Sequence, residues 1–287
     1  MNQANKTIET NGNDESIVRS DAAIKPRKMH FDFDSVQDAY WYDGNAILTA
    51  YFTALSATFP PGEQEFIDSV RHYRDQITDP TLKEQVRGFI GQEAHHRHQH
   101  HQVNEVFDAL GLSATRLEAH LSRHIAIQRK RHSPKTLLAA TVGMEHITAI
   151  LADHVLNHPD VIAPMPKAMQ DLFRWHAVEE IEHKAVAFDV YHRCEGDRIH
   201  LNRVMKFQTL EFIIRSACYT LAILYWKRKM PSLNEISAAF RFFWGKQGLM
   251  RNLAAPYRSF FKKDFHPWNK DNRDLIANWK ENTPSLA

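Results

Sequence analysis

Residues 175–189 read WHAVEEIEHKAVAFD and place His176, Glu180 and His183 four and then three residues apart. Each step is about one helical turn, so all three side chains project from one face of a helix. Phe173 falls on the same face, which marks it as a core-facing stripe. A carboxylate buried between two imidazoles is costly unless a cation compensates its charge. The stretch therefore predicts a helix that offers metal ligands to a protein core.

Three other segments place carboxylates on apolar helix faces. Glu93 and His96 form an E-x-x-H pair, Glu145 lies within an apolar stripe, and Glu63 follows a Pro-Pro-Gly break. Glu65 is the alternative to Glu63 as the ligand of the first helix. One Glu from each of two helices and a Glu-x-x-His from each of two others is the arrangement that holds two metals in a bundle core. We therefore predict an all-α protein, a ferritin-like four-helix bundle with a dimetal core and additional C-terminal helices.

Apolar periodicity and capping residues predict the helices that carry these side chains. Helices are expected over 46–58, from 63 onward, and over 82–110, 114–131, 134–156, 167–193 and 201–226. The segments on either side of the Pro-Pro-Gly break are read as one broken helix or as two helices in succession. Glycine is scarce, with 10 residues in 287, which agrees with a mainly helical chain.

Composition divides the chain into three parts. Residues 1–28 are polar and lack periodicity, so we expect a disordered arm. Residues 29–200 hold the predicted bundle, and 201–287 form a C-terminal helical appendage. The most apolar part, 201–226, is interrupted by Glu211 and Arg215, which favours a buried or interfacial helix over a membrane span.

Two cysteines, Cys194 and Cys218, are too few for a disulfide framework or a thiolate metal site. The polar N-terminus lacks the features of a signal peptide. A cytoplasmic protein is therefore expected, and a homodimer is compatible with the sequence.

Other polar residues near the motifs are assigned less specific roles. His100 lies one turn beyond His96 and is either an outer partner of the ligands or a hydrogen-bonded core histidine. His146 points away from the stripe of Glu145. The residues expected at the surface are His95, His98, His101, Glu179 and Glu182.

Several of these motifs are familiar together. The runs FPPGE (59–63), GQEAHH (91–96), MEH (144–146) and WHAVEEIEHKAVAFD (175–189) resemble a bacterial family of predicted metal-dependent hydrolases, over about residues 30–280. The ligand order is also similar to that of the p-aminobenzoate N-oxygenases, ferritin-like di-iron enzymes with an extra histidine on the last helix. That resemblance implies His176 as a seventh ligand. The chain contains neither an H-E-x-x-H motif nor a His-Asp dipeptide of the helical phosphohydrolase type.

Three functions fit this ligand set. A mixed oxygen and nitrogen set suits iron, with manganese as the alternative, better than softer metals. The first hypothesis is a di-iron oxygenase or oxidase that uses O₂ and a small organic substrate. The second is a dimetal hydrolase, and the third is an iron-binding protein without turnover.

The C-terminal part is basic and aromatic. Residues 227–270 hold ten Lys or Arg against two acidic residues, Glu235 and Asp264. Interleaved aromatic residues are typical of helices that lie on an anionic membrane, here the inner face, and imply a lipophilic substrate. The alternative is that these aromatics pack on the bundle and cap the substrate cavity. A nucleic-acid partner is not expected, because no recognised binding fold accompanies the charge.

Overall fold

The computed structural model describes residues 24–283. Within that range the chain forms ten α-helices and no β-strand, which confirms the all-α prediction.

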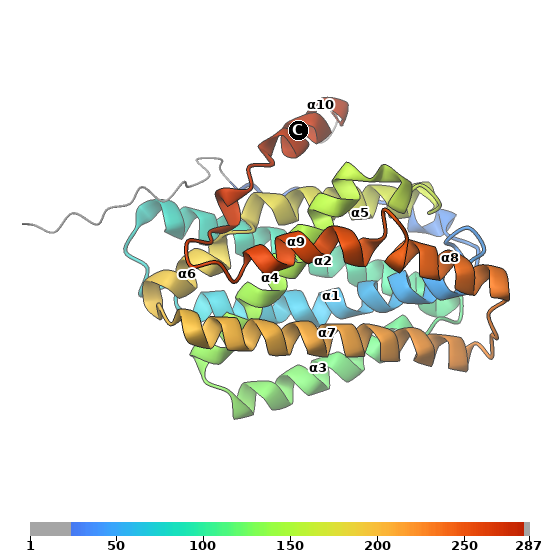
Figure 1. The fold of residues 1–287 in the computed structure, drawn as a ribbon, viewed down its shortest axis with the longest axis horizontal. Helices are drawn as coiled ribbons and strands as arrows, with labels where there is room; N and C mark the ends of the chain where they lie inside the picture. The colour runs from blue at the N-terminus through green and yellow to red at the C-terminus, as the bar shows by residue number, and fades with distance from the viewer. Residues whose placement is uncertain (1–23, 284–287) are drawn as a thin grey trace, which may run out of the picture.

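Four helices form the bundle, and two more lie along it (Figure 1). The bundle helices are α1 (Ala46–His72), α2 (Pro80–Ala109), α4 (Pro134–Asn157) and α5 (Lys167–His183). Outside them, α3 (Ala114–Arg131) packs on α1, and α7 (Arg198–Trp226) packs on both α1 and α4. This arrangement confirms the ferritin-like bundle.

The N-terminal ends of the bundle helices follow the local sequence. Asn45 caps α1, and Asp79 caps α2 by accepting hydrogen bonds from Thr81 and Leu82 N–H groups. Ser133 caps α4, with proline in the first turn. These side chains satisfy backbone N–H groups at the starts of α1, α2 and α4, whereas α5 begins after Pro166 without a side-chain cap.

The Pro-Pro-Gly segment does not break α1, which continues through Pro60 and Pro61. A proline has no N–H to donate, so Pro60 cannot bond the Ser56 carbonyl one turn before it. The Asn104 side-chain amide of α2 donates to that carbonyl instead, at 3.4 Å. A tertiary contact therefore replaces the missing helical bond.

The single helix expected over 167–193 is two helices, α5 and α6 (Val186–Cys194). The two-residue turn between them contains Lys184, whose ammonium donates to the Lys270 carbonyl at 2.8 Å and to Asn272 Oδ1 at 2.7 Å. These partners are remote in sequence, which explains why the local pattern gave no sign of the break.

The C-terminal part adds α8 (Leu233–Trp244), α9 (Leu249–Ser259) and α10 (Arg273–Asn282). Many of its aromatics pack inward, in line with the alternative stated above: Phe242 contacts the rings of Tyr42, Tyr51 and Phe52. The division at residue 200 stays a prediction.

Residues 24–28 were counted with the N-terminal arm, and the structure places them against α2. A Cβ on Gly88 would lie 2.3 Å from the Ile24 carbonyl oxygen, and one on Gly91 would lie 2.4 Å from the Pro26 ring. Only glycine allows so close an approach at either position. The remainder of the predicted arm, residues 1–23, lies outside the described residues.

Candidate metal centre

All seven predicted ligands lie in the bundle core, and none is more than 4% exposed. Helix α1 contributes Glu63, α2 contributes Glu93 and His96, and α4 contributes Glu145. The α5 residues are His176, Glu180 and His183.

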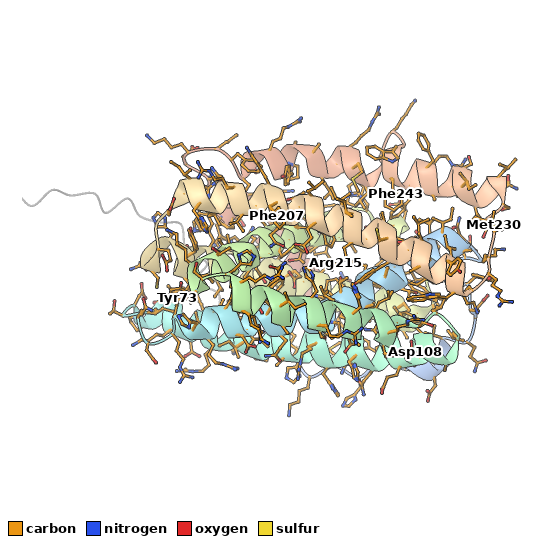
Figure 2. The ribbon with its side chains drawn as sticks, turned by 90° about the horizontal axis from the view of Figure 1, so that it is seen from below. Tyr73, Asp108, Phe207, Arg215, Met230 and Phe243 are labelled. Atoms are coloured by element: carbon orange, nitrogen blue, oxygen red, sulfur yellow. The ribbon has the colours of Figure 1, made fainter. Side chains whose placement is uncertain are left out.

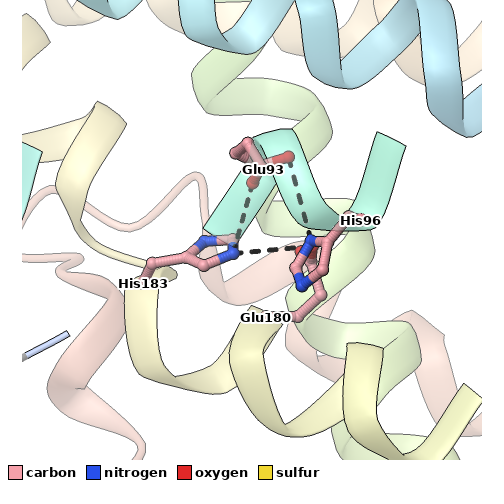
Figure 3. A group of neighbouring side chains, drawn as sticks. All are labelled: Glu93, His96, Glu180 and His183. Carbon is pink, nitrogen blue, oxygen red and sulfur yellow. Dashed lines mark ion pairs between the residues drawn. The ribbon is translucent and has the colours of Figure 1, made fainter. Parts of the chain in front are cut away.

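One set of four ligand atoms converges between α2 and α5 (Figure 3). His183 Nε2 lies 3.2 Å from Glu93 Oε1. Glu180 Oε1 lies 3.7 Å from both His183 Nε2 and His96 Nδ1. One ligand atom from each of these residues falls within 4.8 Å of all the others, close enough to surround one ion.

A second set joins Glu63 and His176 to His100. His176 Nε2 lies 3.7 Å from Glu63 Oε1 and 3.0 Å from Glu180 Oε1. Glu180 therefore contacts members of both sets, the position of a carboxylate that bridges two ions.

Many buried polar atoms at the centre lack a hydrogen-bond partner. They include both oxygens of Glu63 and of Glu93, one oxygen each of Glu145 and Glu180, and one ring nitrogen each of His96 and His183. Buried polar groups are normally paired, because an unpaired one costs about 1–3 kcal/mol. Divalent cations would satisfy these atoms together, so the residues fit a dimetal site.

The pKa values of the buried ligands also fit a site for metal cations. Burial raises the pKa of Glu63 and of Glu93 well above the usual range, and the negative charges of Glu145 and Glu180 raise both further. Burial alone would lower the pKa of His183, but Glu145 and Glu180 raise it to about 9. Protons thus stand in for positive charge that metal ions would supply.

Glu145 lies beside the converging atoms. Its Oε2 is 3.1 Å from His183 Nδ1, the ring nitrogen that faces away from Glu93. Burial raises the pKa of this carboxyl to about 7. Its other oxygen is unpaired, so Glu145 can orient His183 and still bind a metal ion.

Glu179 and Glu182 are buried, so the prediction that they are solvated was wrong. Arg27 donates to Glu179 at 2.9 Å and to both oxygens of Glu182, which compensates the two charges. Glu179 Oε2 in turn lies 3.0 Å from His96 Nε2 and leaves His96 Nδ1 directed at Glu93 and Glu180. The compensating residue comes from a segment distant in sequence, which the helix pattern could not reveal.

His100 is a buried histidine with the contacts of an outer partner of the ligands, one of the two roles considered for it. Its Nε2 lies 2.7 Å from His176 Nδ1, and its Nδ1 lies 3.0 Å from Ser56 Oγ. It is also a member of the second set, as its position one turn after His96 would allow. The sequence signal for this position was the four-residue spacing between His96 and His100, which places both on one face of α2.

The remaining residues lie as follows. Glu63 is 1% exposed at the centre, whereas Glu65 pairs with Arg129 of α3. His146 faces the Pro256 carbonyl and not the centre. His98 and His101 are exposed, and His95 is partly so.

Two apolar cavities border the centre. One, of about 140 Å³, is lined by α1, α3, α4 and α7 and reaches Glu63. The other, of about 60 Å³, reaches His176 and Glu180. Both share walls at Leu55, Phe59, Thr148 and Leu151.

The fold and the centre define a ferritin-like helical protein with a buried Glu/His metal site. More closely, the chain belongs to the family described as predicted metal-dependent hydrolase, whose model matches residues 25–271. No curated protein and no solved structure shows significant similarity to the chain.

Proposed function

We propose that the chain is a non-haem di-iron oxygenase or oxidase that acts on a small apolar organic substrate. The observation that carries the proposal is the apolar cavity that reaches Glu63 at a centre of carboxylates and imidazoles. A cavity of this kind excludes water and holds hydrocarbon beside the metal ligands.

In this proposal the ligands, the carboxylates beside them and the cavity residues have separate roles. The two sets joined by Glu180 would hold two ions side by side, and Glu179 and Glu145 fix the rings of His96 and His183. When bound, two ferrous ions would supply electrons to O₂. Leu55 and Phe59 would hold the substrate on the Glu63 side.

A dimetal hydrolase is the second candidate, and the family description favours it. Two ions in the same ligands could lower the pKa of a bound water. The wall of the larger cavity is mostly apolar, but it also carries the donor side chains of Gln128, Gln208 and Arg215. Such donors could stabilise the oxyanion of an ester, so it is the apolar majority of the wall that favours oxidation of an apolar substrate, and the hydrolase stays the second candidate. Iron binding without turnover leaves the cavities unexplained.

The test separates the two reactions. Metal-free protein is loaded with ferrous iron without air and then exposed to O₂. We expect O₂ uptake in proportion to bound iron, with a transient visible absorption band. Cleavage of p-nitrophenyl octanoate by zinc-loaded protein, together with no iron-dependent O₂ uptake, would establish the hydrolase instead. Glu180→Ala should abolish the O₂ uptake, and the matched control is Glu84→Ala, because Glu84 is exposed on α2 and lies outside both ligand sets.

A further inference from the structure

The outward face of α7 is apolar along most of its length. No exposed residue between Phe207 and Tyr225 is charged. The large apolar side chains exposed along this face are Phe207, Leu210, Ile213, Ile214, Leu221 and Tyr225. Phe207 is 59% exposed and Tyr225 is 79% exposed. An apolar stripe this long on the surface of a protein marks an interaction site.

Helix α8 extends this face. It follows α7 after a turn and runs in the opposite direction (Figure 1), and Figure 2 shows Phe207 on α7 and Met230 in the connecting turn. Leu233, Phe240 and Trp244 are each more than half exposed on α8, and Met230 is 88% exposed. We call the exposed apolar residues of α7, the turn and α8 the α7–α8 face.

The charge around the α7–α8 face is positive. Arg203 and Lys206 are exposed before its first residue, and 227–229 read KRK after its last residue on α7. Residues 203–246, which include the face, contain eight Lys or Arg and two acidic residues, Glu211 and Glu235. Both acids are occupied, since Glu211 pairs with His124 and Arg215 and Glu235 caps α8. The partner should therefore be apolar and anionic.

A second copy of the chain fits this charge poorly. Two α7 helices that met antiparallel would bring 203–206 of one against 227–229 of the other, and a parallel meeting would join like ends. Both arrangements set cation against cation. An anionic lipid surface fits the same residues. The apolar side chains of the face would be buried among acyl chains, and the Lys and Arg side chains would be attracted to the anionic headgroups.

On such a lipid surface, α7 would lie in the plane of the membrane and would not cross it. Among residues 24–283, α7 is the one helix long and apolar enough to cross a bilayer by length and composition. Its inner side packs on α1 and α4, and Glu211 pairs with His124 of α3. Crossing would remove these contacts, whereas lying flat keeps them.

We propose that the α7–α8 face docks the protein on an anionic lipid surface and that lipophilic substrate enters from that side. The second clause rests on the proposed function. Its geometric support is that α7 also walls the larger cavity, with Gln208 and Phe212 next to Phe207 and Ile213 in the sequence. A lipid-derived substrate would pass between α3 and α7 toward Glu63.

Flotation of the full chain with vesicles tests the docking. We expect the protein to float with phosphatidylcholine vesicles that contain phosphatidylglycerol, and to be released by salt as exposed charges are screened. Leu210→Gln with Ile214→Gln should abolish flotation, and Ile127→Gln on α3, also exposed, should not. Arg203→Glu with Lys206→Glu should weaken flotation, and the matched pair Lys83→Glu with Arg87→Glu on α2 should leave it intact.

Other outcomes would overturn the docking proposal. A parent chain that stays with the soluble fraction at low salt, or a dimer that Leu210→Gln with Ile214→Gln converts to monomer, would assign the face to something other than lipid. Flotation needs neither metal nor turnover, so its failure would leave the proposed metal chemistry untouched. Conversely, flotation of a protein that binds no iron would retain the docking and reject the proposed function.

Discussion

His96 and His183 have their two ring nitrogens assigned to different partners. His96 offers one nitrogen to Glu179, His183 offers one to the predicted ligand Glu145, and each ring keeps its other nitrogen for the centre. Such carboxylate partners fix the ring orientation and increase ligand basicity. The orientation of both imidazoles is therefore set by carboxylates on neighbouring turns and helices.

Replacement of His183 tests the centre directly. The parent should hold about two metal ions per chain, as in comparable bundles, and His183→Ala should lose most of one, because its Nε2 belongs to the first set. Glu145→Ala should also lower the metal content, since it orients His183. Mass spectrometric metal analysis is the measurement, with Glu65→Ala as the control. Full metal content in both variants would refute the bundle-core site.

Arg27 should stabilise the fold through Glu179 and Glu182. Its removal leaves two buried carboxylates without their cation, and breaking a buried pair costs about 3–5 kcal/mol. Arg27→Ala should therefore lower the free energy of unfolding in urea by about 3 kcal/mol. Arg74→Ala, an exposed arginine, is the control and should change it little. Equal stability of the two variants would mean that the pairs do not compensate the buried charge.

At the scale of elements, the close passage of residues 24–28 over α2 gives a test of its own. Gly88→Ala should displace this segment, because the new Cβ would lie 2.3 Å from the Ile24 carbonyl oxygen. Trypsin should then cleave faster after Arg27 and Lys28. Gly62→Ala, also in a helix, meets nothing within 4 Å and should leave cleavage unchanged. Unchanged cleavage in Gly88→Ala would show that the segment is not held there.

The elements also show what the sequence could reveal. The Ser133-Pro134 pair and the apolar periodicity predicted a helix over 134–156, within one residue of α4, because those signals are local. The continuity of α1 through Pro60 and the break at Lys184 depend on Asn104, Lys270 and Asn272, which are remote in sequence. The ligand-bearing faces were predictable because helical spacing alone sets them. The burial of Glu179 was not, because Arg27 lies 152 residues away.

For the whole molecule, metal removal should cost stability, and the cost should grow with pH. Without metal, the pKa of Glu145 is raised from 4.5 to about 7 and that of His183 from 6.5 to about 9. A group whose pKa is raised in the folded state stabilises it fully below the unfolded pKa, and this contribution is lost as the pH rises through the folded pKa. The metal-free protein should thus lose stability between about pH 5 and pH 9.

Metal ions replace those protons and bind more tightly as the ligands deprotonate, so the loaded protein should not follow the same decline. The comparison is a thermal unfolding series of the loaded and metal-free protein at matched pH and salt. The difference in Tm should widen as the pH rises from about 5 to about 9. Glu145→Gln, which keeps the side-chain shape without its titration, should reduce that widening. If the metal-free protein melted at or above the Tm of the loaded form throughout, these carboxylates would not share a metal-binding centre.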